Sequence, residues 1–230
     1  MNKSNTSSAG GNNYKTSRRA FSHVTNEHRP LLRGWVHAVA VLMWVPLSIV
    51  LIGKSDEIYR KPLLIYVTAV FATLAISAYY HILAISKKKQ QLWQRIDHAG
   101  VFILILGSYV PISYAVLSFT SATLLIIGVA ILSVIGGILR GLGKSKKFAS
   151  SLYIVTGWFG LLILPELLKT SVYATLLIFI GGVSYTIGAV FFKIKWPYKN
   201  STVFGYHEVF HLCTLLGVLS QYCAILILSS

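Results

Sequence analysis

Residues 204–228, FGYHEVFHLCTLLGVLSQYCAILIL, form an apolar stretch with two histidines near its beginning. The stretch is longer than the about 20 residues that a helix needs to cross the hydrocarbon layer of a membrane. On a helix, His207 and His211 lie one turn apart on the same face. Polar side chains at membrane depth are costly, so they indicate a functional site. Two histidines at this spacing supply two ligands to one metal ion, and further ligands must come from elsewhere in the chain.

The whole chain has the composition of an integral membrane protein. It contains 230 residues, of which 55% are hydrophobic and only 12% are charged, whereas soluble domains carry about 25% charged residues. Other apolar stretches of spanning length lie at about 33–53, 62–85, 97–118, 121–140, 149–168 and 171–192. The sequence therefore predicts an all-α fold: a bundle of seven transmembrane helices over residues 29–230, in a multi-pass protein of the plasma membrane.

The formal net charge of +15 is distributed unevenly along the chain. Seventeen of the 21 Lys and Arg residues lie in the N-terminal segment and in alternate loops on one side of the predicted spans, and four lie on the other side. Cytoplasmic loops carry such an excess. We therefore expect a cytoplasmic N-terminus and an extracytoplasmic C-terminus, with residues 1–28 as a disordered, basic cytoplasmic tail. Because the basic residues do not gather on one soluble face, we predict no nucleic-acid partner.

Histidines that suit a metal site gather at the predicted cytoplasmic end of the spans. His81 lies about 9 Å inside the membrane boundary, counted from Lys87 at 1.5 Å per residue. His207 and His211 lie at a similar depth after Lys199. Three neutral imidazoles from two helices are the ligands of an open zinc site, in which a water molecule takes the fourth position. We therefore predict that His81, His207 and His211 bind Zn²⁺.

Two more polar residues lie at the same depth. Asp97 opens the third predicted span, and Ser77 precedes His81 by one helical turn on the same face. Asp97 could accept a hydrogen bond from a bound water or from an imidazole, and Ser77 could donate or accept one. Zinc lowers the pKa of a water that it binds, which makes that water a nucleophile for a carbonyl carbon. Asp97 and Ser77 are therefore expected to lie beside the metal ion and its bound water.

Structural interpretations of the polar residues stay open at this point. Ser77 could bond only to the carbonyl one turn earlier in its own helix. His37 could lie in the headgroup region or pack against the bundle instead of binding the metal. His98 points about 100° away from Asp97 on the helix, as a packing residue would. Glu208 could face the cytoplasm and pair with a lysine.

These motifs resemble those of the hemolysin III proteins, within the progestin and adiponectin receptor superfamily of seven-span membrane proteins. The matching residues are Ser77-Ala78-Tyr79-Tyr80-His81, Arg95-Ile96-Asp97-His98-Ala99-Gly100 with Gly107-Ser108-Tyr109-Val110-Pro111, Gly157-Trp158 with Pro165, and His207-Glu208-Val209-Phe210-His211. The resemblance covers nearly the whole chain after residue 28. It implies a zinc ion held by the three histidines, with Ser77 and Asp97 beside it. Arg33 stands where many members carry an Asn before His37, which weakens the role expected of that stretch.

The resemblance leaves two classes of function open. As an enzyme, the chain would be a zinc-dependent hydrolase of a lipid amide or ester, similar to ceramidases, with an acyl chain of the substrate between the helices. Asp97 would then shuttle a proton, and Ser77 would orient the water or stabilise the oxyanion. As a non-enzyme, it would be a membrane sensor or a membrane-perturbing, hemolytic protein in which zinc only holds two helices together. A transporter is disfavoured, because the outer half of the spans lacks a relay of charged residues.

Overall fold

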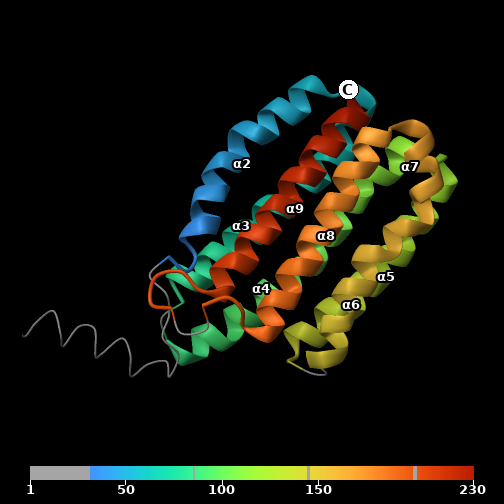
Figure 1. Ribbon diagram of the computed structural model, residues 1–230. Coiled ribbons are helices and arrows are strands. Elements are labelled where there is room, and N and C mark those ends of the chain that lie inside the picture. The colour runs from blue at the N-terminus through green and yellow to red at the C-terminus, as the bar shows by residue number, and fades with distance from the viewer. Residues whose placement is uncertain (1–31, 85, 144–145, 199–200) are drawn as a thin grey trace, which may run out of the picture.

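A computed structural model describes residues 32–84, 86–143, 146–198 and 201–230. The described residues form helices and no strand. The elements are α2 (Trp35–Lys54), η1 (Glu57–Tyr59), α3 (Arg60–Ile82), α4 (Lys87–Val116), α5 (Phe119–Gly141), α6 (Lys146–Trp158), η2 (Phe159–Ile163), α7 (Leu164–Thr170), α8 (Val172–Ile194) and α9 (Tyr206–Ser229). The long helices run side by side as one bundle (Figure 1). The predicted tail, residues 1–28, lies outside the described residues.

Seven helical segments are long and apolar enough to cross a membrane, with α6, η2 and α7 together forming the fifth. Their outward faces carry large exposed apolar side chains, among them Leu42, Ile131 and Leu176. Such faces suit contact with acyl chains, and a helix satisfies its backbone hydrogen bonds internally, as the hydrocarbon layer requires. The predicted all-α bundle of seven spans is confirmed, and the chain is a multi-pass membrane protein.

The third span begins earlier than the sequence predicts. α4 starts at Lys87 rather than near residue 97, so the basic segment before Asp97 is helical. The side chain of Ser86 caps this start by accepting a hydrogen bond from the Lys89 N–H at 3.4 Å. The helix thus extends beyond its apolar part, because Lys, Gln and Arg are good helix formers even where no apolar face is buried.

The fifth span is interrupted. α6 ends at Trp158, and a 3-10 segment leads into α7, which has Pro165 in its first turn. Proline is tolerated there because the first amides of a helix have no intrahelical partner. Just before the interruption, the carbonyls of Thr156 and Gly157 accept hydrogen bonds from the Tyr109 hydroxyl, at 3.1 and 3.0 Å. The side chain of Tyr109 therefore ties α4 to the end of α6.

A close approach sets the register of α3 against α4. Thr73 Oγ1 donates across the interface to the carbonyl of Gly100 at 3.1 Å. Further along, Gly107 lies against Ala69, where an added Cβ would collide with the alanine side chain. The two helices run in opposite directions, so the residues that follow Thr73 face those that precede Gly100. This register brings Ser77 opposite Asp97.

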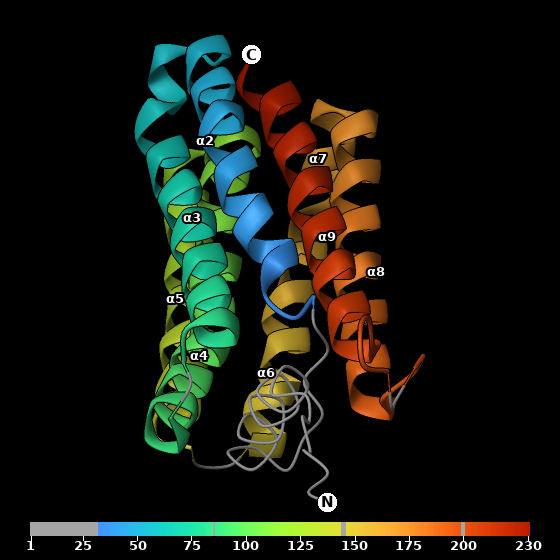
Figure 2. The same ribbon diagram turned by 90° about the vertical axis from the view of Figure 1, so that its left-hand side faces the viewer.

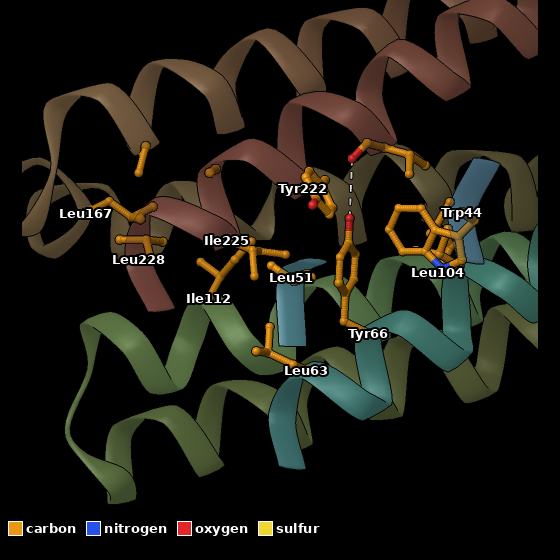
Figure 3. Close-up of a cluster of buried hydrophobic side chains, with 14 of the residues drawn as sticks. Trp44, Leu51, Leu63, Tyr66, Leu104, Ile112, Leu167, Tyr222, Ile225 and Leu228 are labelled. Carbon is orange, nitrogen blue, oxygen red and sulfur yellow. Dashed lines mark hydrogen bonds between the residues drawn. The ribbon is translucent and has the colours of Figure 1, made fainter. Parts of the chain in front are cut away.

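The core lies between α2, α3, α4, α7 and α9 (Figure 3). Trp44 packs edge-on against Tyr66 and Tyr222, with ring centroids 5.6 and 5.9 Å away. Trp44 Nε1 donates to the carbonyl of Val67 at 3.0 Å, and the Tyr66 hydroxyl donates to that of Val218 at 3.3 Å. Large aromatic rings thus fill the core while their polar atoms keep partners.

α9 packs most extensively against α8. Small residues on α8 make this approach possible: Ser184 Oγ donates to the Cys213 carbonyl at 2.8 Å, and a Cβ added to Gly188 would lie 2.8 Å from that of Cys213. Close packing of small residues replaces the hydrophobic driving force that is missing between helices in lipid. These contacts hold the helix that carries His207 and His211 in a defined position.

Candidate metal centre

The three predicted ligands lie at helix ends on one end of the bundle. His81 is in the last turn of α3, and His207 and His211 are in the first two turns of α9. The start of α9 is well defined, because Glu208 Oε2 accepts a hydrogen bond from the Gly205 N–H at 2.7 Å. This bond satisfies one of the amides that a helix start leaves unpaired.

The imidazoles of these residues form one group. Nε2 of His207 lies 3.2 Å from Nε2 of His81, and one ring nitrogen from each of the three histidines lies within 4.8 Å of the others. Two nitrogens bound tetrahedrally to one zinc ion at about 2.0–2.1 Å are separated by roughly 3.3 Å. The spacing between His81 and His207 is therefore already that of two ligands on one ion.

The surroundings of the group also fit a metal ion. His81 and His211 are buried, and His207 is half-buried. Neither ring nitrogen of His211 has a hydrogen-bond partner among the described residues. A buried imidazole without a partner is costly, and a metal ion would use one of its nitrogens as a ligand. The three histidines could therefore hold a metal ion.

Ser77 and Asp97 meet between α3 and α4. Ser77 lies one turn before His81 and is buried, and its Oγ has no hydrogen-bond partner within the described parts of the chain. Its hydroxyl is therefore not taken up by the carbonyl one turn earlier, contrary to the structural interpretation. Asp97 lies about three turns into α4, is half-buried, and has its carboxyl group beside Ser77. The structure thus places an acid and a hydroxyl next to the turn that carries His81.

Glu208 does not face the cytoplasm with a lysine partner. It is fully buried, and Arg33 Nε donates to its Oε1 at 3.3 Å. Arg33 precedes α2, so this ion pair joins the chain just before α2 to the first turn of α9, where Figure 2 shows the beginning of α2 approaching α9. A carboxylate fully removed from solvent requires such a charged or hydrogen-bonded partner.

His37 also lies beside the three clustered histidines. It is 6% exposed, and its ring packs edge-on against that of His211, with the ring centroids 4.1 Å apart. Both of its ring nitrogens are without a hydrogen-bond partner in the described part of the chain. Of the two structural interpretations of His37, packing against the bundle is the one observed, and the residue that it packs against is one of the three clustered histidines.

His98 contributes a structural contact through its backbone. Its carbonyl accepts a hydrogen bond from the Tyr153 hydroxyl at 2.7 Å, and Tyr153 in turn accepts one from Arg140 Nε at 2.9 Å. These bonds link α4, α5 and α6 next to the turn that carries Asp97.

Two residues near the centre were missed by sequence reasoning. Arg33 was set aside because it departs from the pattern of the resembling family, and Gly34 was not considered. The sequence did contain an indication of the role of Arg33, since a glutamate in an apolar span, such as Glu208, calls for a polar or charged partner. Arg33 is the basic residue nearest to the start of the first span.

Comparison with known proteins gives a consistent result. The sequence profile of the family described as "Haemolysin-III related" matches residues 25–222. A protein named "Hemolysin-3 homolog" from Bacillus subtilis (strain 168) is 25% identical over 205 residues, which cover 83% of this chain and 89% of that protein. "Heptahelical transmembrane protein ADIPOR2" from Oryza sativa subsp. japonica is 28% identical over 200 residues, covering 75% and 84%. "Heptahelical transmembrane protein 1" from Arabidopsis thaliana is 25% identical over 241 residues, covering 91% and 72%.

Proposed function

The chain belongs to the haemolysin-III related family, and from this premise we propose that it is a zinc-dependent hydrolase that cleaves an amide or ester bond of a lipid within the membrane. The observation that carries the proposal is the group formed by His81, His207 and His211, with two Nε2 atoms 3.2 Å apart. Imidazole ligands suit zinc, and a site with three protein ligands keeps a position for water or substrate.

Zinc bound at this group would supply a water molecule of lowered pKa and would polarise the carbonyl of the substrate. Asp97 is the residue that we assign to proton transfer: its carboxyl group takes a proton from the attacking water and returns it to the leaving group. Ser77 is assigned to the hydrogen bond that orients the water or stabilises the developing oxyanion, because its buried hydroxyl lies beside the Asp97 carboxyl, one turn before His81.

A lipid is the class of substrate that the location supports. His211 lies in a helix with an apolar, outward-facing surface, on which Leu212, Leu216 and Leu219 are exposed. A substrate that enters from the hydrocarbon layer is expected to be apolar over the part that lies there, as the acyl chain of a lipid is. The scissile amide or ester would lie near the headgroup of that lipid, at the depth of the helix ends.

A second candidate function is a non-enzymatic sensor or membrane-perturbing protein with structural zinc. The observation that favours it is the origin of the ligands, since a metal ion here would link the end of α3 to the start of α9. A relative from Bacillus cereus carries the name "Hemolysin-3". In this alternative, Asp97 and Ser77 would have no role beyond packing.

Comparing Asp97→Asn with His207→Ala separates the two functions. The purified proteins are assayed for zinc content and for hydrolysis of a panel of ceramides and phospholipids in mixed micelles. The hydrolase predicts that Asp97→Asn keeps zinc and loses at least about 100-fold in activity, the scale of general acid–base catalysis, and that His207→Ala loses both. Asp56→Asn, at the exposed other end of the bundle, is the matched control. Equal hydrolysis by wild type and Asp97→Asn would rule out the proposed mechanism.

A further inference from the structure

One short segment, Arg33–His37, contacts the surroundings of all three clustered histidines. Arg33 bonds to Glu208, the neighbour of His207; Gly34 lies against His81; and His37 packs against His211. We propose that this segment is the positioning element of the metal centre, anchored by the ion pair between Arg33 and Glu208. The inference rests on the metal site of the proposed function and adds residues that bind no metal themselves.

The ion pair between Arg33 and Glu208 holds the first turn of α9 against the chain that precedes α2. Arg33 Nε lies 3.3 Å from Glu208 Oε1, and the two side chains are 11% and 0% exposed. The second carboxylate oxygen of Glu208 accepts the bond from the Gly205 N–H at 2.7 Å. Glu208 therefore has both oxygens engaged, one with the chain before α2 and one with its own helix start. Since His207 is the adjacent residue, these bonds fix the rotation at which α9 presents its imidazole.

Gly34 brings the segment against α3. Its φ angle is +89°, a conformation that L side chains rarely adopt. A Cβ added to Gly34 would lie 2.7 Å from the Cβ of His81 and 2.8 Å from Cγ1 of Ile82. The N–H of Leu32, the residue just before the segment, also donates to the Val203 carbonyl at 3.2 Å, which ties the start of the segment to the chain before α9. Only glycine permits this fit, so the backbone of the segment supports His81 directly.

His37 completes the support from inside α2. Its ring meets that of His211 at 67°, with the centroids 4.1 Å apart. Because the buried ring of His37 packs directly against that of His211, it occupies space into which the His211 ring would otherwise turn. The three contacts are made to His81, to His211 and to Glu208, the neighbour of His207, so displacement of the segment would disturb every ligand of the group. Residues that orient metal ligands without binding the metal are commonly worth about 10- to 100-fold in metal affinity.

Two sets of substitutions that leave the net charge of the protein unchanged test the proposal. Gly34→Ala adds one methyl group without altering charge, and its matched control is Gly53→Ala, where an added Cβ meets nothing within 4 Å. The double variant Arg33→Met/Glu208→Gln removes both charges and leaves net charge unchanged; its matched control is Arg60→Met/Glu57→Gln, which removes the exposed ion pair of 3.2 Å. The full-length variants are purified in detergent, and their thermal stability is measured to confirm that they fold.

The readouts are zinc affinity by chelator competition and the visible absorption of bound Co²⁺, which reports coordination geometry. We expect Gly34→Ala and Arg33→Met/Glu208→Gln to bind zinc about 10- to 100-fold more weakly and to show an altered Co²⁺ spectrum, while both controls behave as wild type. Unchanged affinity and spectrum in the folded test variants would overturn the positioning role. If wild type itself binds neither ion, the metal site of the proposed function is overturned as well. Should Gly34→Ala not fold, the charge-neutral double variant still decides the outcome.

Discussion

His81 and His207 are 126 positions apart in the sequence, yet their Nε2 atoms lie 3.2 Å from one another. Two uncharged imidazoles gain little from such an approach unless a proton or a metal ion lies between them. The spacing suits an N–H···N hydrogen bond between neutral rings, and it also matches that of two nitrogens on one tetrahedral ion, about 3.3 Å. His211 completes the group with nitrogens that have no partner among the described residues.

The first prediction concerns metal content. We expect wild type, purified without added metal, to contain about one zinc ion per chain, and His81→Ala, His207→Ala and His211→Ala to lose it, because two imidazoles do not make a complete site. Elemental analysis by mass spectrometry measures the stoichiometry. Cys223→Ala is the control, since it removes a residue of ligand type further along the same helix. Full zinc occupancy in His207→Ala would contradict the assignment.

The second prediction concerns metal removal. A ligand that binds only the folded state stabilises it, by about 2.7 kcal/mol when its free concentration is about 100 times the dissociation constant. Treating wild type with a strong chelator should therefore lower its melting temperature by several degrees, and added zinc should restore it. A thermal scan of the detergent-solubilised protein measures the change. His207→Ala should not respond to either treatment; an equal response from this variant would show that zinc acts elsewhere.

The third prediction concerns orientation in the membrane. The excess of Lys and Arg in alternate loops predicts that the C-terminus lies outside the cytoplasm. Alkaline phosphatase fused after Ser230 should therefore be active, and green fluorescent protein fused at the same place should be dark. Fusions after Gly143, in the loop between α5 and α6, should give the opposite result and serve as the internal control. Fluorescence at Ser230 with an inactive phosphatase would reverse the topology and place the histidines at the outer surface.

Local features of the sequence were enough to predict the spans and the three clustered histidines. Apolar length identifies each span, and the depth of His81 can be counted from Lys87 along a helix of known rise. The same reasoning failed where the outcome depends on tertiary contacts. The partner of Glu208 is 175 positions away, and no periodicity in either segment indicates that they meet.

Two helix boundaries were missed for a different reason. The start of α4 at Lys87 depends on the Ser86 cap and on helix propensity, whereas apolar length marks only the part that lies in lipid. The interruption after Trp158 occurs within an uninterrupted apolar stretch, in which Pro165 alone indicates a new helix start. Hydropathy therefore locates spans well and helix ends poorly.

The fourth prediction tests the packing between α4 and α5, which holds in place the helix that carries Asp97. A Cβ added to Gly136 on α5 would collide with the ring of Phe102 on α4, which is buried against Tyr153 and has no room to move. Gly136→Ala should therefore destabilise the bundle by about 1–3 kcal/mol, the usual cost of overpacking. Gly137→Ala, one residue further, meets nothing within 4 Å and should be neutral or stabilising by up to about 1 kcal/mol, because alanine favours a helix. Unfolding in mixed micelles with increasing SDS measures both. Equal effects of the two substitutions would show that α4 and α5 do not pack as described.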